Sequence, residues 1–205
     1  MKNIVQGAIA NGQKALSEYD SKRVIAMAGV PVSRILTHKT EMGMVKLKLK
    51  NDDEVAAAYD EITGKGITLD GVLVQEWIEG DKREFVVALT RDPQFGPCVM
   101  LGLGGIFTEA LKDVSFRVAP LSTLDAEEMI DEIRTKKLLG EFRGSPAVDR
   151  DGLVKALVAI GNLGVEYDEI AEIDINPLII DGSRPVAVDA LVILRRETAA
   201  DEKSA

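Results

Sequence analysis

Three side chains that carry oxygen ligands alternate with apolar side chains near the C-terminal end of the sequence. Glu172, Asp174 and Asn176 are separated by Ile173 and Ile175. Successive side chains of a strand point to opposite faces, so the oxygen ligands are expected on one face and the isoleucines on the other. Two carboxylates on one face repel each other unless solvent or a cation offsets their charge, and Mg²⁺ binds such hard oxygen ligands. The pattern is compatible with a solvated outer face or with a magnesium site.

A fourth oxygen ligand, Asp189, interrupts the apolar segment 186–192. A buried carboxylate without a partner would be unfavourable by several kcal/mol. The turn-forming residues 181–185 lie between the two apolar segments and favour a hairpin. If the two strands pair, Asp189 can join Asn176 at one ion, which favours the metal site.

Two further segments could contact the phosphates of a nucleotide. Gly104 and Gly105 end the sequence GLGG at residues 102–105, where backbone N–H groups can approach phosphate oxygens closely. On spacing alone a tight turn is the commoner explanation, and the segment lacks the Lys-Ser or Lys-Thr ending of a P-loop. Arg117 could donate two hydrogen bonds to a phosphate, or it is an ordinary surface arginine.

A strand-like segment, residues 72–78, contains the polar pair Gln75 and Glu76, followed by Trp77 and Ile78. Backbone groups here could hydrogen-bond to the edge of an adenine ring while Trp77 or Ile78 covers its face. Packing of Trp77 in the core explains the same residues equally well.

His38 is the single histidine and lies in a polar segment that ends at Gly43. Imidazole can accept a phosphoryl group at neutral pH, and Lys39 could stabilise the phosphorylated form. A lone surface histidine is the commoner case. A Ser or Cys triad within the chain would need His38, and a His-rich metal site is excluded.

Composition limits the other functions. The 205 residues are 46% hydrophobic and 29% charged, which is enough for one domain or two small lobes with a core. No apolar run reaches the ~20 residues of a membrane span, and the polar start is unlike a secretory signal, so a cytoplasmic location is expected. Cys98 is the single cysteine, which argues against a disulfide framework, and it is expected in the core. The net charge of −9 disfavours nucleic acid as a partner.

Hydrophobic periodicity and turn residues predict an α+β fold. The predicted helices cover residues 14–28, 52–62, 149–162 and a segment that begins at a capping box of Ser122 and Asp125. The predicted extended segments are residues 30–35, 45–50, 72–78, 84–90, 97–103, 170–175 and 186–193. Short links favour antiparallel pairing of the strands after residue 72.

Taken together, four segments resemble the ATP-grasp beta subunit of ADP-forming acetyl-CoA synthetases, which is related to the beta subunit of succinyl-CoA synthetase. They are residues 36–49 (LTHKTEMGMVKLKL), 72–84 (VLVQEWIEGDKRE), 95–121 (FGPCVMLGLGGIFTEALKDVSFRVAPL) and 172–192 (EIDINPLIIDGSRPVAVDALV). Residues 15–19 and the helix around them also match, so the resemblance covers nearly the whole chain apart from its charged tail.

The resemblance implies an ATP-grasp fold, in which two α/β lobes hold a nucleotide between them. Residues 1–78 would form the N-terminal lobe with the phosphohistidine loop, residues 79–195 the C-terminal lobe with the Mg²⁺ site, and residues 196–205 a charged tail. The resemblance also implies that the adenine lies at residues 75–78 and that Glu84 lies near the ribose.

By the same resemblance, Asn176 and Asp189 ligate Mg²⁺, Asp174 faces the metal or the phosphohistidine, and His38 is a phosphohistidine on a mobile loop. The implied reaction interconverts acyl-CoA, ADP and phosphate with a carboxylic acid, ATP and CoA. The phosphoryl group passes from an acyl phosphate to a histidine of an alpha subunit, then to His38 and finally to ADP. The implied cofactors are ATP or ADP with Mg²⁺. The implied partner is a CoA-binding alpha subunit in a hetero-oligomer, because nothing here resembles a CoA-binding Rossmann unit.

The sequence departs from this family at Ile35. The family carries a helix and a strand with a phosphate-binding lysine before the segment that matches residues 36–41, whereas Ile35 here leads directly to Leu36. The N-terminal lobe is therefore expected to be truncated. Two other functions stay open: a nucleotide-binding or assembly module without catalysis, and a different ATP-grasp ligase that activates a carboxylate directly.

Overall fold

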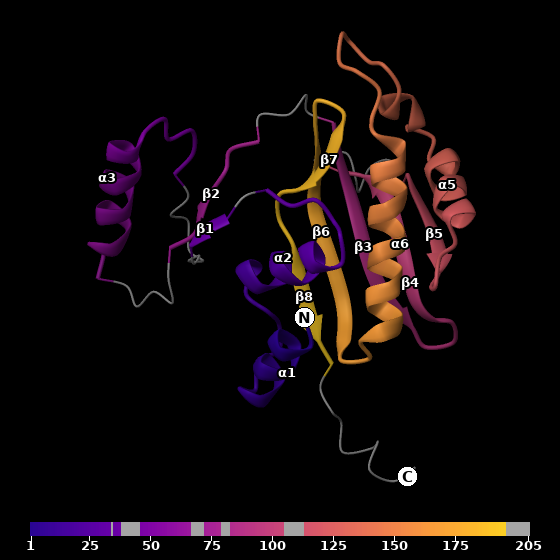
Figure 1. Cartoon of the computed structure of the whole chain (residues 1–205), viewed down its shortest axis with the longest axis horizontal. Helices are drawn as coiled ribbons and strands as arrows, with labels where there is room; N and C mark the ends of the chain where they lie inside the picture. Colours follow the sequence, from indigo (N-terminus) through magenta and orange to yellow (C-terminus); the bar gives the residue numbers. More distant parts are fainter. Residues whose placement is uncertain (34, 38–45, 67–71, 79–82, 105–112, 196–205) are drawn as a thin grey trace. The chain divides into compact units, whose positions relative to one another are not determined.

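The computed structural model describes residues 1–33, 35–37, 46–66, 72–78, 83–104 and 113–195. The chain divides into two compact units, a smaller one of residues Ser33–Ile78 and a larger one of Met1–Val32 with Glu79–Ala205 (Figure 1). Residues 1–32, which the sequence interpretation assigned to the N-terminal lobe, therefore belong to the same unit as the C-terminal sheet.

The larger unit contains an antiparallel sheet in the order β5-β4-β3-β6-β7, with β8 also paired to β6. Its strands are β3 (Glu84–Asp92), β4 (Gly96–Leu103), β5 (Val114–Val118), β6 (Ile170–Asp181), β7 (Arg184–Ala187) and β8 (Leu191–Leu194). The first half of β6 pairs with β8, and its second half forms the predicted hairpin with β7.

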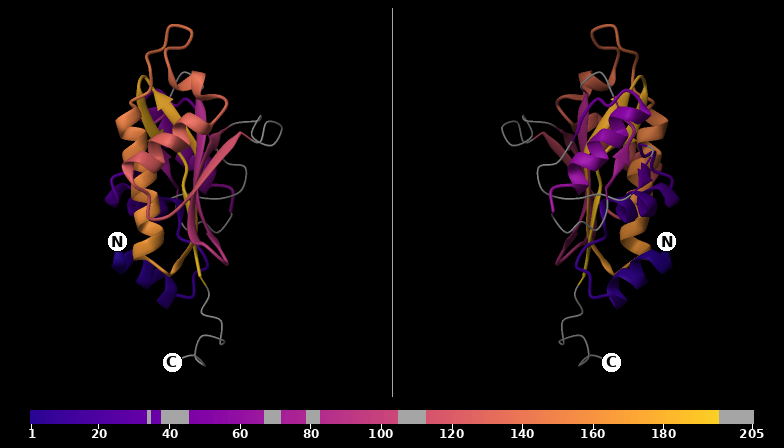
Figure 2. Two further views of the ribbon diagram at one scale, coloured as in Figure 1. Left: turned by 90° about the vertical axis from the view of Figure 1, so that its right-hand side faces the viewer. Right: turned by 90° about the vertical axis from the view of Figure 1, so that its left-hand side faces the viewer.

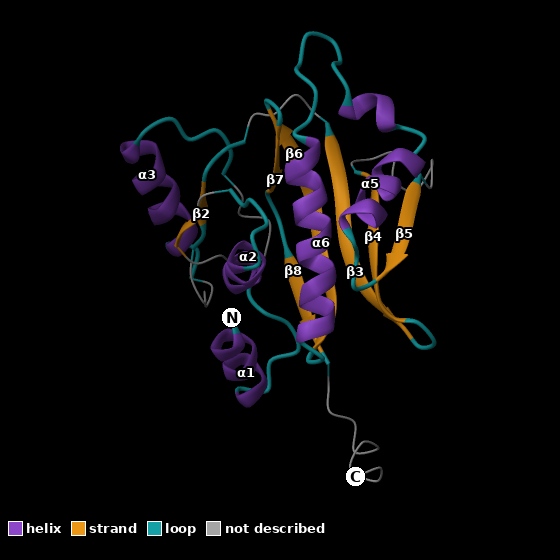
Figure 3. Cartoon of the chain, turned by 45° about the vertical axis from the view of Figure 1, so that its right-hand side comes forward, coloured by secondary structure: helices purple, strands orange, loops and turns teal. Residues whose placement is uncertain are grey.

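The helices of the larger unit cover one face of this sheet. They are α1 (Lys2–Ala10), α2 (Glu18–Met27), α5 (Thr123–Glu132), α6 (Arg150–Glu166) and the short 3-10 helix η2 (Lys136–Leu139). Figure 3 shows α6 lying along the middle strands with α5 beside it, and the nearly edge-on views of Figure 2 show α6 on one side of the sheet. No helix in the described parts of the chain is long and apolar enough to cross a bilayer.

Local signals at the helix starts agree with the sequence. The predicted capping box is present, because Ser122 Oγ accepts from the Asp125 backbone N–H and the Asp125 carboxylate accepts from the Ser122 N–H. The Asp149 carboxylate caps α6 by accepting from the Gly152 N–H. Small residues on α6 then allow close packing, since a Cβ on Gly164 would lie 2.4 Å from a methyl group of Leu89.

The smaller unit contains α3 (Asp52–Thr63) and an antiparallel pair, β1 (Ile35–Thr37) and β2 (Val74–Gln75). The side chain of Asn51 caps α3, by accepting from the Glu54 N–H. The strand predicted over residues 45–50 was wrong for its described part: residues 46–50 are outside any strand, and Lys48 has a φ of 61°, which extended backbone excludes.

Two other element predictions needed correction. The strand predicted over residues 186–193 is interrupted, because β7 ends at Ala187 and β8 begins at Leu191. The strand predicted over residues 72–78 is reduced to the two residues of β2. The first helix, α1, was not predicted.

A buried arginine holds the connections at one end of the larger unit. Arg83 is 3% exposed, and its guanidinium donates to the carbonyl oxygens of Leu138, Gly140, Pro146 and Gly182 at 3.0 to 3.2 Å. These carbonyls belong to segments far apart in the sequence, so one side chain ties η2, the loop before α6 and the β6-β7 turn together.

We expect Arg83→Met to lower the free energy of unfolding by about 2 kcal/mol or more, because buried carbonyls lose charged donors. Chemical denaturation measures this. The matched control is Arg184→Met, since Arg184 is 69% exposed with one ion-pair contact of 3.4 Å, and it should change stability by less than about 0.5 kcal/mol. Equal effects of the two substitutions would contradict the role given to Arg83.

Candidate functional site

The strand register divides the sheet side chains between two faces. Asp174 on β6 pairs with Ala88 on β3, which pairs with Met100 on β4, which pairs with Phe116 on β5. Directly paired residues of antiparallel strands point to the same face. We call the face that carries this row the carboxylate face.

The other face is the one that the helices cover. The neighbouring row of Ile175, Val87 and Leu101 is at most 1% exposed and belongs to the core. The contacts of the α6 glycines with Leu89 and Val99 lie on this side. The prediction that Glu172, Asp174 and Asn176 point away from the buried isoleucines is therefore confirmed: Ile173 and Ile175 are fully buried, Asp174 is half-buried, and Glu172 and Asn176 are exposed.

The interruption between β7 and β8 brings Asp189 beside this row. The Val188 N–H donates to the Pro177 carbonyl at 3.1 Å, and Leu191 pairs with Asp174. On β6, Asn176 lies between Asp174 and Pro177. Asp189 lies between Leu191 and Val188, which are the partners of those two residues. Asp189 is therefore across from Asn176. The structure brings together Asp174, Asn176 and Asp189, the three residues that the sequence nominated for Mg²⁺.

The ionisation of Asp174 is affected by burial and by the acids near it. Burial raises the pKa of Asp174 above its ordinary value, and the negative charges of Glu172 and Asp189 raise it further. An ionised Asp174 is therefore unfavourable in the free protein, and a bound cation would offset the repulsion.

The donor set fits Mg²⁺ held jointly with a nucleotide. In the described parts of the chain, no three His, Cys, Asp or Glu side chains form a group that could hold a metal ion by themselves. The predicted set has two carboxylates, Asp174 and Asp189, and one amide, Asn176. Mg²⁺ usually takes one or two protein carboxylates together with substrate phosphates, so a smaller acidic set is what a nucleotide-bound Mg²⁺ needs.

Glu84 and Gly104 lie at one end of the same face. Glu84 is an even number of residues from Ala88 on β3, and it pairs with Ile179 of β6. The Gly104 N–H donates to the Glu84 carbonyl at 2.8 Å. A Cβ on Gly104 would come within 2.9 to 3.0 Å of the backbone of Glu84 and Phe85, so close strand approach requires this glycine. Gly105 lies outside the described residues.

Arg117 is not brought together with the acids. It pairs with Val99, whose partner on β3 is Leu89, so its side chain belongs to the helix-covered face. Its guanidinium bonds to Glu132 at 2.6 and 2.8 Å and to Glu128 at 3.3 Å, both on α5. The register thus gives Arg117 a structural role in fixing α5 to β5.

The predicted adenine segment lies in the smaller unit. Gln75 ends β2, Glu76 and Trp77 are exposed, and Ile78 is half-buried. Trp77 is 47% exposed, which argues against the core-packing alternative, and the ammonium of Lys48 lies 5.7 Å from its ring centroid. An exposed aromatic side chain is thus present in this segment. His38 lies outside the described residues.

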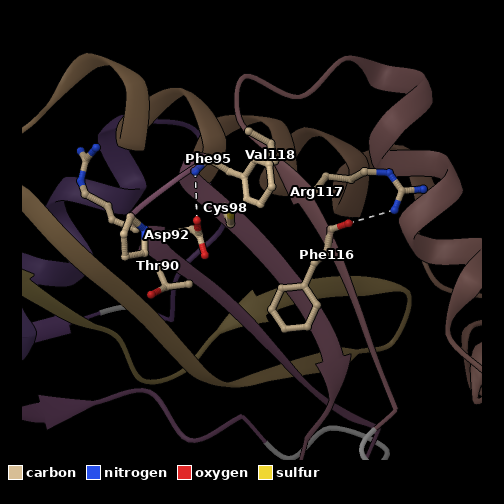
Figure 4. Close-up of a pocket in the computed structure, with 9 residues that line it drawn as sticks. Thr90, Asp92, Phe95, Cys98, Phe116, Arg117 and Val118 are labelled. Carbon is tan, nitrogen blue, oxygen red and sulfur yellow. Dashed lines mark hydrogen bonds between the residues drawn. The ribbon is translucent and has the colours of Figure 1, made fainter.

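A shallow hollow lies at the turn between β3 and β4 (Figure 4). It is lined by Thr90, Arg91, Asp92, Pro93, Phe95, Cys98, Phe116, Arg117 and Val118. Cys98 was expected in the core, but it is only partly buried here. None of Glu172, Asp174, Asn176 and Asp189 lines the hollow, so it is separate from the candidate metal site.

A family model described as an ATP-grasp domain matches residues 32–194. The chain belongs to the ATP-grasp family. Two relatives of this ATP-grasp chain come from Pyrococcus furiosus. The acetate–CoA ligase (ADP-forming) I subunit beta is 44% identical over 169 residues, with 80% of this chain and 72% of the relative covered. The acetate–CoA ligase (ADP-forming) II subunit beta is 31% identical over 229 residues, with 94% and 97% covered.

Solved structures agree with the sequence relatives. Ca. Korarchaeum cryptofilum dinucleotide forming acetyl-coenzyme A synthetase 1 matches with a TM-score of 0.87 and 40% identity, covering 95% of this ATP-grasp chain and 99% of that chain. That structure contains coenzyme A, acetyl-coenzyme A and a phosphorylated phosphohistidine segment. A second structure of that protein contains Mg-AMPPCP, with the phosphohistidine segment pointing towards the nucleotide binding site. The predicted ATP-grasp fold and family are thereby confirmed.

The alignment with the subunit beta of ligase II also shows a difference in length. It extends over 229 positions, whereas 94% of the 205 residues of this chain is about 193, so about 36 aligned positions are filled only in the relative. This ATP-grasp chain is therefore shorter than that relative inside the aligned region.

We expect Asp174→Asn to stabilise the metal-free protein at pH 7, because the neutral amide removes a buried charge and its repulsion with Glu172 and Asp189. A group with a raised folded-state pKa destabilises above that pKa and ceases to do so when protonated, so the advantage of the variant should shrink as the pH falls through the pKa of Asp174.

Denaturant unfolding in EDTA over a series of pH values measures this difference. Glu127→Gln is the control, because Glu127 is exposed on α5 and its substitution should have little effect. A less stable Asp174→Asn protein at pH 7 would show that Asp174 is held by a favourable partner instead.

Proposed function

We propose that this chain is the nucleotide-binding subunit of an ADP-forming acyl-CoA synthetase. The observation that carries the proposal is that the break between β7 and β8 sets Asp189 beside Asp174 and Asn176 of β6. Relatives that share the ATP-grasp domain and are named as ADP-forming ligases supply the reaction class.

The chemistry at this face is the transfer of a phosphoryl group between His38 and ADP. Asn176 and Asp189 would hold Mg²⁺, and Asp174 would complete the oxygen environment or face the phosphohistidine. When bound, the ion supplies positive charge that offsets the charge of the transferring phosphoryl group. Protein groups in such a reaction mainly orient the reactants and exclude water. Residues 75–78 would receive the adenine, and Glu84 would lie near the ribose.

The overall reaction interconverts acyl-CoA, ADP and phosphate with a carboxylic acid, CoA and ATP. A second subunit that binds CoA is proposed to form the acyl phosphate and to pass its phosphoryl group to His38, because two relatives are named as beta subunits. The use of ADP and CoA makes the cytoplasm the expected location.

A second candidate function is a nucleotide-binding or assembly module without catalysis. The departure at Ile35 favours it, because the resemblance implies a phosphate-binding lysine in a segment before Leu36. The two candidates share nucleotide binding and differ in phosphorylation of His38, so two separate measurements distinguish them.

The first measurement is the affinity for ADP with Mg²⁺ by calorimetry. Asp189→Asn should weaken binding at least tenfold, about 1.4 kcal/mol, because one charged oxygen ligand is lost. Glu166→Gln is the control, since Glu166 is exposed at the end of α6. ADP without Mg²⁺ should bind the wild type and Asp189→Asn alike. No binding of Mg-ADP to the wild type would refute both candidate functions.

The second measurement is transfer of labelled phosphate from γ-labelled ATP to the chain in the presence of Mg²⁺ and a CoA-binding subunit. Acid-labile label is expected on the wild type and not on His38→Asn, because the amide cannot form a phosphoramidate of this kind. Label retained by His38→Asn would exclude the phosphohistidine role. Nucleotide binding without any label would favour the module without catalysis.

A further inference from the structure

Lys22 is a charged residue with a fully buried side chain. It lies in the middle of α2, its side chain is 0% exposed, and its ammonium is 3.3 Å from the carboxylate of Glu18, which is 8% exposed. Lysine is almost never buried to this extent unless it is paired. Helix α2, which contacts β8, therefore carries an ion pair inside the protein.

The charge of Lys22 acts on the candidate metal site. Burial lowers the pKa of Lys22 to about 8, and the negative charge of Asp189 opposes this change. The ammonium of Lys22 thus contacts the Glu18 carboxylate and lies within electrostatic range of Asp189.

Backbone hydrogen bonds attach the segments before and after α2 to residues on either side of Asp189. Before the helix, the Leu16 N–H donates to the Val192 carbonyl at 2.9 Å. After the helix, the Pro31 carbonyl accepts from the Ala187 N–H at 2.9 Å. The segment 188–190 therefore lies between two attachment points of the same helical unit.

A side-chain bond fixes the helix next to Lys22 itself. Ser21 is buried, and its Oγ accepts from the Val192 backbone N–H at 3.1 Å. The α2 backbone at Lys22 is thereby held against the strand that follows Asp189. Because its backbone is fixed beside Val192, the charged side chain of Lys22 can orient a nearby carboxylate.

We propose that Lys22 is a positioning residue, whose buried ammonium orients the Asp189 carboxylate for Mg²⁺ and offsets part of the negative charge that Asp189 shares with Asp174. That the ammonium of Lys22 lies within electrostatic range of Asp189, while its direct ion pair is with Glu18, rests on the structure. The use of that interaction for Mg²⁺ rests on the proposed function. The competing explanation is that Lys22 serves only as the partner of Glu18 within α2.

A double-mutant cycle in EDTA tests the pairing. Lys22→Met should raise the unfolding equilibrium constant more in the wild type than in Asp189→Asn, with at least a tenfold difference between the two effects. Equal effects in the two backgrounds would overturn the proposal. If Lys22→Met does not fold, Lys22→Gln takes its place, because it removes the charge and keeps a polar end.

Calorimetry with Mg-ADP tests the use of the pair. Lys22→Met should bind Mg-ADP at least tenfold more weakly than the wild type, and adding it to Asp189→Asn should cause no comparable further loss. Lys155→Met, on the exposed side of α6, is the matched control and should bind like the wild type. Wild-type affinity in Lys22→Met would overturn the positioning role. Absence of Mg-ADP binding in the wild type would instead refute the proposed function, while the cycle in EDTA would still decide whether Lys22 and Asp189 interact.

Discussion

The backbone pairing of β6 is the interaction on which the rest of the structure depends. Its 12 residues pair with β3 along one edge, and with β8 and then β7 along the other. Because two short strands share that second edge, residues 188–190 between them leave the regular ladder. Asp189 is the middle residue of that interval, so its position beside Asn176 follows from the pairing of strands and not from a local turn motif.

The same pairing places negatively charged side chains near one another at a half-buried position of the sheet. Asp174 lies between Ala88 and Leu191 in the ladder, and burial together with the neighbouring acids raises its pKa. A side chain selected for stability alone would be neutral at this position. The destabilisation is tolerated because the opposite face of the sheet contributes a continuous apolar core with α6 and α5. A local conflict of this kind inside a well-packed unit is typical of a functional site.

Local pattern was sufficient for some features of the site and insufficient for others. The period of two at residues 172–176 correctly gave the face of Asp174, because one buried face imposes alternation on the strand itself. The same rule failed at residues 46–50, where alternating Lys and Leu lack a strand. The face of Arg117 depends on the register between β4 and β5, which separates it from the acids. Lys22 was missed because a helical lysine has the same sequence pattern whether β8 covers it or solvent does.

In the proposed function, the departure at Ile35 makes the larger unit more important for phosphate binding. The described part of the smaller unit has one helix and a two-stranded sheet, an architecture that is marginal by itself. Where the resemblance implies a lysine for the phosphates, this chain has no corresponding segment before Leu36, and its net charge of −9 opposes an anionic ligand. In the proposed function, a cation at Asn176 and Asp189 must therefore provide much of the attraction for the phosphates. Because the acids repel one another without it, the cation and the nucleotide should each favour binding of the other at this face.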